Sequence, residues 1–118
     1  MSDLSRILGD FQERVNGNKR VASLIRGWRR SIVVKQDGSG ERYTLRVDKG
    51  RIEHVTPGDM GDEDELIMVS GRDDIVSAVF TGAKNPAKEF LNGTLTVLGD
   101  EADKIKLDAI CVVLWGGL

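Results

Sequence analysis

The stretch DDIVSAVFTGAKNPAKEFLNGTLTVLGDEADKIKLDAI, which runs from Asp73 to Ile110, decides the fold. Its apolar spacing predicts a first helix over residues 71–80. A second helix is expected to begin with Asn85 as its cap and Pro86 at the first helical position, because proline has no N–H to lose there. Gly93 ends this second helix.

A strand and a terminal helix complete the same stretch. Residues 94–98 form the strand, and Asp100 is expected to cap the terminal helix, with Asp103 favourably placed near the positive end of its dipole. We expect the second helix to bury Phe90 and Leu91. The terminal helix presents a broad apolar face that consists of Ile105, Leu107, Ile110, Cys111 and Leu114.

The residues upstream predict a helical start followed by a strand-rich half. Residues 3–16 show the i, i+3, i+4, i+7 spacing of an amphipathic helix, and a shorter helical pattern capped by Asn18 follows. Three short strands are expected within 31–56, joined by glycine-containing hairpin turns at 37–40 and 48–50.

A polar loop separates this meander from the strand before residue 71. The loop covers residues 57–65 and is expected to carry the chain to a new position in the sheet, where residues 66–69 form the next strand. The order of elements predicts an α+β fold rather than a regular βαβ alternation.

Length and composition predict one globular domain over residues 1–118, with 40% apolar and 31% charged residues. The net charge of −2 argues against a nucleic-acid partner. Cys111 is the single cysteine, so an intramolecular disulfide is excluded. Neither a secretory signal, an 18-residue apolar run nor a peroxisomal Ser-Lys-Leu ending is present, and a cytoplasmic protein is therefore expected.

The stretch from Asp73 to Ile110 resembles the sterol carrier protein 2 family in the order of its glycine turns, its Asn-Pro helix start and its strand end. The segment GERYTLRVDKGRIEHVTPGD (Gly40 to Asp59) is similar to the strand-turn-strand segment of that family. This resemblance implies a five-stranded mixed sheet with helices packed on one side around an apolar cavity. Members of that family hold fatty acids, acyl-CoA, phospholipids or sterols. The marks that carry the resemblance are Gly82, Asn85, Pro86, Gly93, Gly99 and Asp100.

The leading hypothesis is non-enzymatic binding and carriage of a fatty acid, fatty acyl-CoA, isoprenoid or sterol-like lipid in that cavity. Each methylene that a ligand buries contributes roughly 0.8 kcal/mol, so an under-filled core can bind a chain lipid without polar contacts. The alternative is that the same side chains only pack against one another. The candidate lipid-binding residues are Ile75, Val79, Phe80, Phe90, Leu91, Leu95, Val97, Ile105, Ile110 and Leu114.

Two further functions stay open at this point. The first is an accessory module that presents a lipid intermediate to a biosynthetic enzyme, with the apolar tail 111–118 and the basic stretch 19–35 as docking surfaces. The tail could equally line the cavity or form a homodimer interface. The basic stretch could hold a phosphate or make transient contact with an anionic membrane surface. The second function is an enzyme that acts on an acyl thioester.

Catalytic and metal sites have weak support in the sequence. His54 is the single histidine and has no evident catalytic partner, and Cys111 lies in an apolar helix. The acidic run at 59–65 does not follow the spacing of a calcium loop. We therefore expect neither catalytic residues, a metal nor a cofactor.

Overall fold

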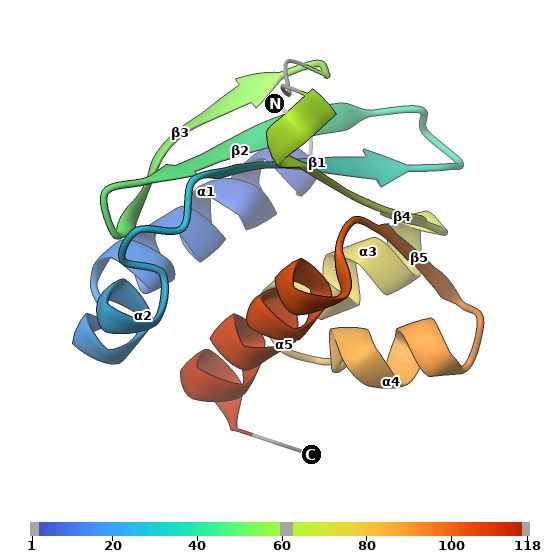
Figure 1. Ribbon diagram of the computed structural model, residues 1–118. Coiled ribbons are helices and arrows are strands. Elements are labelled where there is room, and N and C mark those ends of the chain that lie inside the picture. Colours follow the sequence, from blue (N-terminus) through green and yellow to red (C-terminus); the bar gives the residue numbers. More distant parts are fainter. Residues whose placement is uncertain (1–2, 60–62, 117–118) are drawn as a thin grey trace.

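The computed structural model describes residues 3–59 and 63–116, which form one mixed sheet with helices on one of its faces (Figure 1). The elements in chain order are α1 (Asp3–Asn16), α2 (Lys19–Leu24), β1 (Arg30–Gln36), β2 (Arg42–Asp48), β3 (Arg51–Pro57), the 3₁₀ turn η1 (Glu63–Glu65), β4 (Leu66–Gly71), α3 (Asp73–Thr81), α4 (Pro86–Leu91), β5 (Leu95–Leu98) and α5 (Glu101–Trp115).

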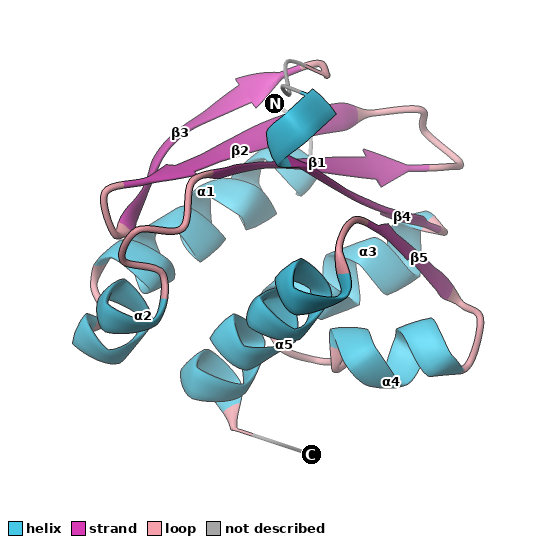
Figure 2. Cartoon of the chain, viewed as in Figure 1, coloured by secondary structure: helices cyan, strands magenta, loops and turns pink. Residues whose placement is uncertain are grey.

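The five strands run in the order β3-β2-β1-β4-β5. The central pair, β1 and β4, is parallel, whereas the other neighbours are antiparallel. The loop after β3 therefore carries the chain across to the far side of β1, as predicted. All five α-helices lie on the same face of the sheet (Figure 2), which confirms the expected α+β class and layer arrangement.

Local sequence signals account for most element boundaries. The side chains of Asn18 and Asn85 accept backbone hydrogen bonds at the starts of α2 and α4, as capping predicts. Lys49 and Gly50 both have positive φ, which is the geometry of a two-residue hairpin turn between twisted strands. One expected boundary was wrong, because Gly71 is the last residue of β4 and the following helix begins at Asp73.

The core lies between the helical layer and the inner face of the sheet. Phe11 of α1 meets Phe80 of α3 edge to face, with ring centroids 5.1 Å apart, and lies 5.9 Å from the ring of Trp115. Trp115 also covers Gly82, where an added Cβ would come within 2.5 Å of the indole ring. The buried core residues include Leu4, Leu8, Val15, Val21, Ile25, Ile32, Leu45, Ile67, Val69, Val76 and Leu107.

The apolar tail is thus largely an internal element. Val113, Leu114 and Trp115 are partly buried and pack against the core. The tail therefore packs partly inward over its described residues, and its use as a docking or dimer surface stays a prediction; Gly117 and Leu118 lie outside the described residues.

A buried carboxylate joins the last helix to the start of the sheet. Asp103 of α5 is 6% exposed, and its Oδ1 accepts a 2.8 Å hydrogen bond from the Trp28 indole Nε1. Its Oδ2 accepts a 2.9 Å hydrogen bond from Arg30 Nε. Asp103 is therefore a tertiary anchor rather than a dipole partner alone, and Asp100 occupies the N-cap position without a side-chain capping bond, contrary to expectation.

We predict that Asp103→Ala lowers the free energy of unfolding by about 2–3 kcal/mol, because it strands a buried indole N–H and removes the partner of Arg30. Urea denaturation measures the loss. Glu101→Ala is the matched control, since this exposed carboxylate makes only a 3.8 Å contact with Lys104 and its removal should change stability little. Equal stability of the two variants would contradict the anchoring role.

Candidate functional site

An apolar groove of about 220 Å³ opens at the edge of the molecule between α4, β5 and α5. Its walls are mostly hydrocarbon, and its charged members all come from α5. The lining residues are Pro86, Ala87, Phe90, Leu91, Val97, Glu101, Lys104, Ile105, Leu107 and Asp108.

Three large apolar side chains of this groove are exposed to solvent. Phe90 is 38% exposed, Leu91 81% and Ile105 64%, which contradicts the prediction that α4 buries the first two and that Ile105 belongs to a buried face. Exposed apolar side chains that gather around one hollow are typical of a binding surface. These three residues therefore define the candidate site.

The orientation of α4 explains this exposure. The helix buries Pro86 and Glu89 in place of its two largest apolar residues. Glu89 is held inward by Thr94, whose hydroxyl donates a 3.0 Å hydrogen bond to the Glu89 carboxylate and whose N–H donates a 3.0 Å bond to the Glu89 carbonyl. With Glu89 fixed inward, Phe90 and Leu91 lie on the exposed side of this six-residue helix.

The charged groups of the groove are arranged around its apolar floor. Lys104 Nζ lies 4.9 Å from the centroid of the Phe90 ring and 3.8 Å from the carboxylate of Glu101. Asp108 Oδ1 is buried and has no hydrogen-bond partner within residues 3–59 and 63–116. The groove thus combines a hydrocarbon surface with a cation that already has a partner.

The ten predicted lipid-binding residues fall into two groups. Phe90, Leu91, Val97 and Ile105 line the groove. The other six belong to the interior, where Leu114 is partly buried and the remaining five are buried core residues, namely Ile75, Val79, Phe80, Leu95 and Ile110. Phe80 also borders a separate hollow beside α1. The structure therefore does not bring all ten together at one surface.

Sequence reasoning identified Ile105 but missed the charged residues beside it in the groove. Glu101, Lys104, Ile105 and Asp108 follow one another at i, i+3, i+4 and i+7, which places them on one face of α5. An isoleucine surrounded by charged residues on a helical face is a sign of exposure that the periodicity already contained.

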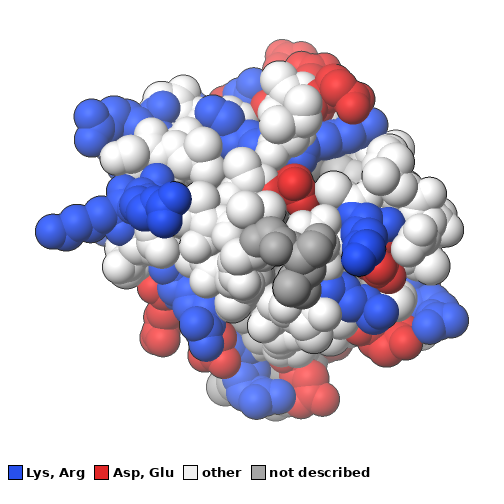
Figure 3. Space-filling view, turned by 90° about the horizontal axis from the view of Figure 1, so that it is seen from below, with Lys and Arg blue, Asp and Glu red and all other residues white. Residues whose placement is uncertain are grey.

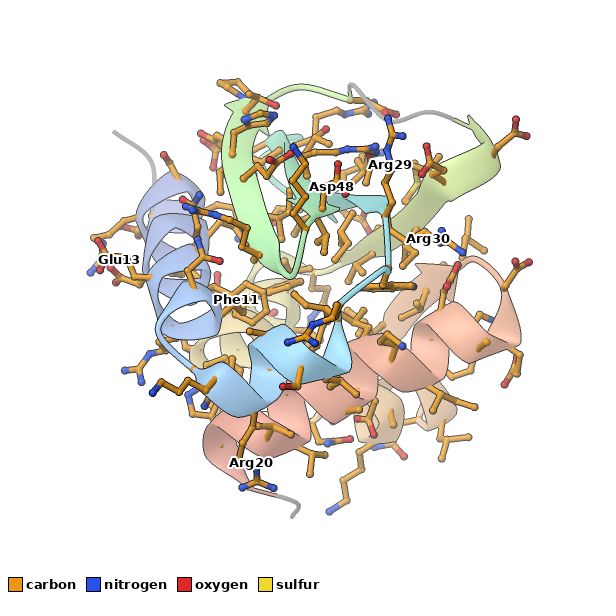
Figure 4. All side chains as sticks on the ribbon, turned by 60° about the vertical axis from the view of Figure 1, so that its left-hand side comes forward. Phe11, Glu13, Arg20, Arg29, Arg30 and Asp48 are labelled. Carbon is orange, nitrogen blue, oxygen red and sulfur yellow. The ribbon has the colours of Figure 1, made fainter. Side chains whose placement is uncertain are left out.

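The basic stretch does not contribute to this groove. Arg30 binds Asp103, and Arg29 lies 3.9 Å from Asp48 and 3.6 Å from Glu65, at the entry to β1 (Figure 4). On the helical face, Figure 3 shows cationic side chains gathered at the edge over α2, beside a broad uncharged area. The stretch is thus split between ion pairs and an exposed basic edge.

The single histidine and the single cysteine lie in different layers. His54 is exposed on β3, whereas Cys111 is buried in α5. Within the described residues, three potential metal ligands do not come together anywhere, although Asp62 of the acidic run lies outside them. No described helix has the length and apolar character needed to cross a bilayer.

No family model matches the sequence, and no curated protein matches it. Solved structures do share its fold. Sterol carrier protein-2 like-3 from Aedes aegypti superposes with a TM-score of 0.67 at 14% identity, over 92% of this chain and 96% of that chain. A UbiJ-SCP2 ubiquinone synthesis protein superposes with a TM-score of 0.62 at 17% identity, over 94% of this chain and 87% of that one.

A larger enzyme contains a similar unit. The inverting sec-alkylsulfatase from Pseudomonas sp. matches with a TM-score of 0.61 at 12% identity over 82% of this chain. The chain spans only 14% of the length of that enzyme. These matches establish that the chain has the fold of sterol carrier protein 2.

We predict that Cys111 is unreactive in the native protein. Burial, together with the nearby negative charge of Asp108, raises the pKa of the thiol to about 12 from a reference value of 9.0, and the reactive thiolate is therefore depleted below that pH. Because the folded chain holds the thiol proton more tightly than the unfolded chain does, the neutral thiol contributes its full stabilisation of the fold below pH 9.0. This contribution is lost as the pH rises towards 12. Iodoacetamide labelling at about pH 8 should be slow until urea unfolds the chain, and fast native labelling would contradict the buried position.

Proposed function

We propose that this chain, which has the fold of sterol carrier protein 2, binds and carries a lipid and catalyses no reaction. One observation carries the proposal: Phe90, Leu91 and Ile105 are exposed around a single groove in this fold. Leaving three large apolar side chains in water is unfavourable unless a ligand or partner covers them. A hydrocarbon chain fits this need, because it covers apolar walls without requiring polar contacts.

The size of the groove indicates how a lipid would be held. A volume of about 220 Å³ lies below the roughly 300–1,000 Å³ that is usual for small-molecule pockets, so the groove receives one end or segment of a chain. We propose that α4 moves outward around a longer chain, since it contributes only Pro86 and Glu89 as buried residues. Phe90, Leu91, Val97 and Ile105 are then the lipid contacts.

The interior residues have a different part in this proposal. Ile75, Val79, Phe80, Leu95 and Ile110 are 5% exposed or less and pack into one cluster. In this proposal they form the core of the domain and are not lipid contacts of the groove.

We expect Ile105→Glu to weaken binding of a chain lipid roughly tenfold or more, because it adds a third acidic group to the groove, beside Glu101 and Asp108, in place of an apolar wall residue. Leu98→Glu is the matched control: Leu98 is 57% exposed on β5 and does not line the groove. Native mass spectrometry with solvent extraction identifies the bound lipid, and titration of that lipid measures the affinity. Unchanged affinity in Ile105→Glu, with the fold intact by circular dichroism, would remove the groove as the binding site.

A second candidate function is an accessory module that presents the lipid to a biosynthetic enzyme. Two observations favour it: the similarity in fold to a UbiJ-SCP2 ubiquinone synthesis protein, and the exposure of Leu98 outside the groove. An apolar side chain beside a lipid site is well placed to contact the protein that receives the lipid.

This second function predicts different effects of Leu98→Glu and Ile105→Glu on enzyme copurification and on lipid binding. Leu98→Glu should reduce copurification of a lipid-biosynthetic enzyme from host cells while lipid binding persists, and Ile105→Glu should reduce lipid binding first. Identification of the copurified proteins by mass spectrometry measures the effect. If no such enzyme is recovered with the wild-type chain, carriage without an enzyme partner is the remaining function.

A further inference from the structure

The two edges of the sheet are built differently. β3 forms one edge, begins with the charged residue Arg51 and ends with Pro57. Its register against β2 is also irregular between Arg46 and Val47, as at a β-bulge. Charges, proline and bulges are the usual means by which a protein prevents another strand from pairing with an edge.

β5 forms the opposite edge and has none of these features. Figure 1 shows it as the outermost strand, next to α4. Its four residues, Leu95, Thr96, Val97 and Leu98, contain neither a charge nor a proline, and their register against β4 runs without a shift. β5 therefore presents a regular, uncharged backbone edge.

Exposed apolar side chains flank this edge on both faces of the sheet. Val97 points inward and lines the groove together with Leu91, which is 81% exposed. Leu98 follows Val97 and so lies on the outer face, where it is 57% exposed and pairs with Met68 of β4. An unprotected edge with apolar side chains on either side is suited to pairing with another strand.

The charge pattern of β5 favours a second copy of this chain as the partner. In a two-fold interface, residues close to the axis meet their own counterparts. A charged strand would then place like charges opposite each other, which is unfavourable. Because β5 is uncharged over its whole length, it meets no such repulsion from its own copy.

We propose that two copies of this chain associate through β5, with the two strands antiparallel across a two-fold axis perpendicular to the sheet. The two sheets continue into one, and both helical layers lie on the same side of it. Leu98 is shielded on the outer face and Leu91 on the helical face, between the two α4 helices. Since β5 has only four residues, these side chains add contact that the strand alone does not supply.

This association goes beyond lipid binding. It also gives Leu98 a different neighbour from the one that the accessory-module function would give it. The experiment therefore has to separate pairing with a second copy from the use of the same edge by another protein.

Analytical ultracentrifugation of the wild-type chain from about 1 to 500 µM should show a monomer–dimer equilibrium. Thr96→Lys should raise the dimer dissociation constant roughly tenfold or more, because the added charges of the two copies meet close to the axis. Thr96 is exposed and does not line the groove. His54→Lys is the matched control: it adds the same charge at an exposed position of the other edge strand and should leave the equilibrium unchanged.

A mixture of Thr96→Lys with Thr96→Glu tests whether the strand pairs with its own copy. Each variant alone should be largely monomeric, since its like charges repel. In the mixture, opposite charges meet across the axis, and a dimer with one chain of each kind should form at close to the wild-type affinity. Native mass spectrometry identifies this mixed dimer by its mass.

Three results would overturn the inference: a wild-type chain that stays monomeric over the whole concentration range, a dimer that Thr96→Lys leaves unchanged, or a mixture that does not associate. Circular dichroism verifies that each variant is folded. Lipid binding is measured separately, so a monomer that binds lipid would retain the proposed function, and a dimer that binds none would lose it.

Discussion

The arrangement of the molecule depends on the contact of Asp103 with Trp28 and Arg30. It joins the first turn of α5 to the residues that enter β1, and thus connects the last helix to the centre of the sheet. A buried charge is tolerated there because both of its oxygens receive a donor. With Asp103 and Leu107 directed inward, the rotation of α5 is set, and the face that carries Ile105 and Asp108 lies towards the groove.

Much of the fold was predictable because its signals are local. Alternation along Tyr43, Leu45 and Val47, the turn at Lys49 and Gly50, and the asparagine caps each depend on a few neighbouring residues. Asp103 shows the opposite case. Its spacing from the helix start indicated a dipole role, whereas its real partners are Trp28, 75 positions away in sequence, and Arg30, 73 positions away. No local pattern contains that information.

The candidate site was only partly predictable for a related reason. In a helix as short as α4, periodicity cannot decide which side faces inward, and hydrophobicity alone favoured Phe90 and Leu91 over Glu89. The Thr94 hydroxyl reverses that choice by giving the Glu89 carboxylate a partner. The predicted lipid-binding residues were therefore chosen for their hydrophobicity alone. Half of them are ordinary core residues, such as Phe80, which packs edge to face against Phe11.

One departure from ordinary packing lies at the groove. Three large apolar side chains, Phe90, Leu91 and Ile105, are exposed around it although neighbouring positions of α4 and α5 are buried. Apolar surface left in water reduces the stability of the free protein. Departures from packing rules concentrate at functional sites. The candidate role of the groove therefore rests on these exposed side chains, and the likeness in fold supports it.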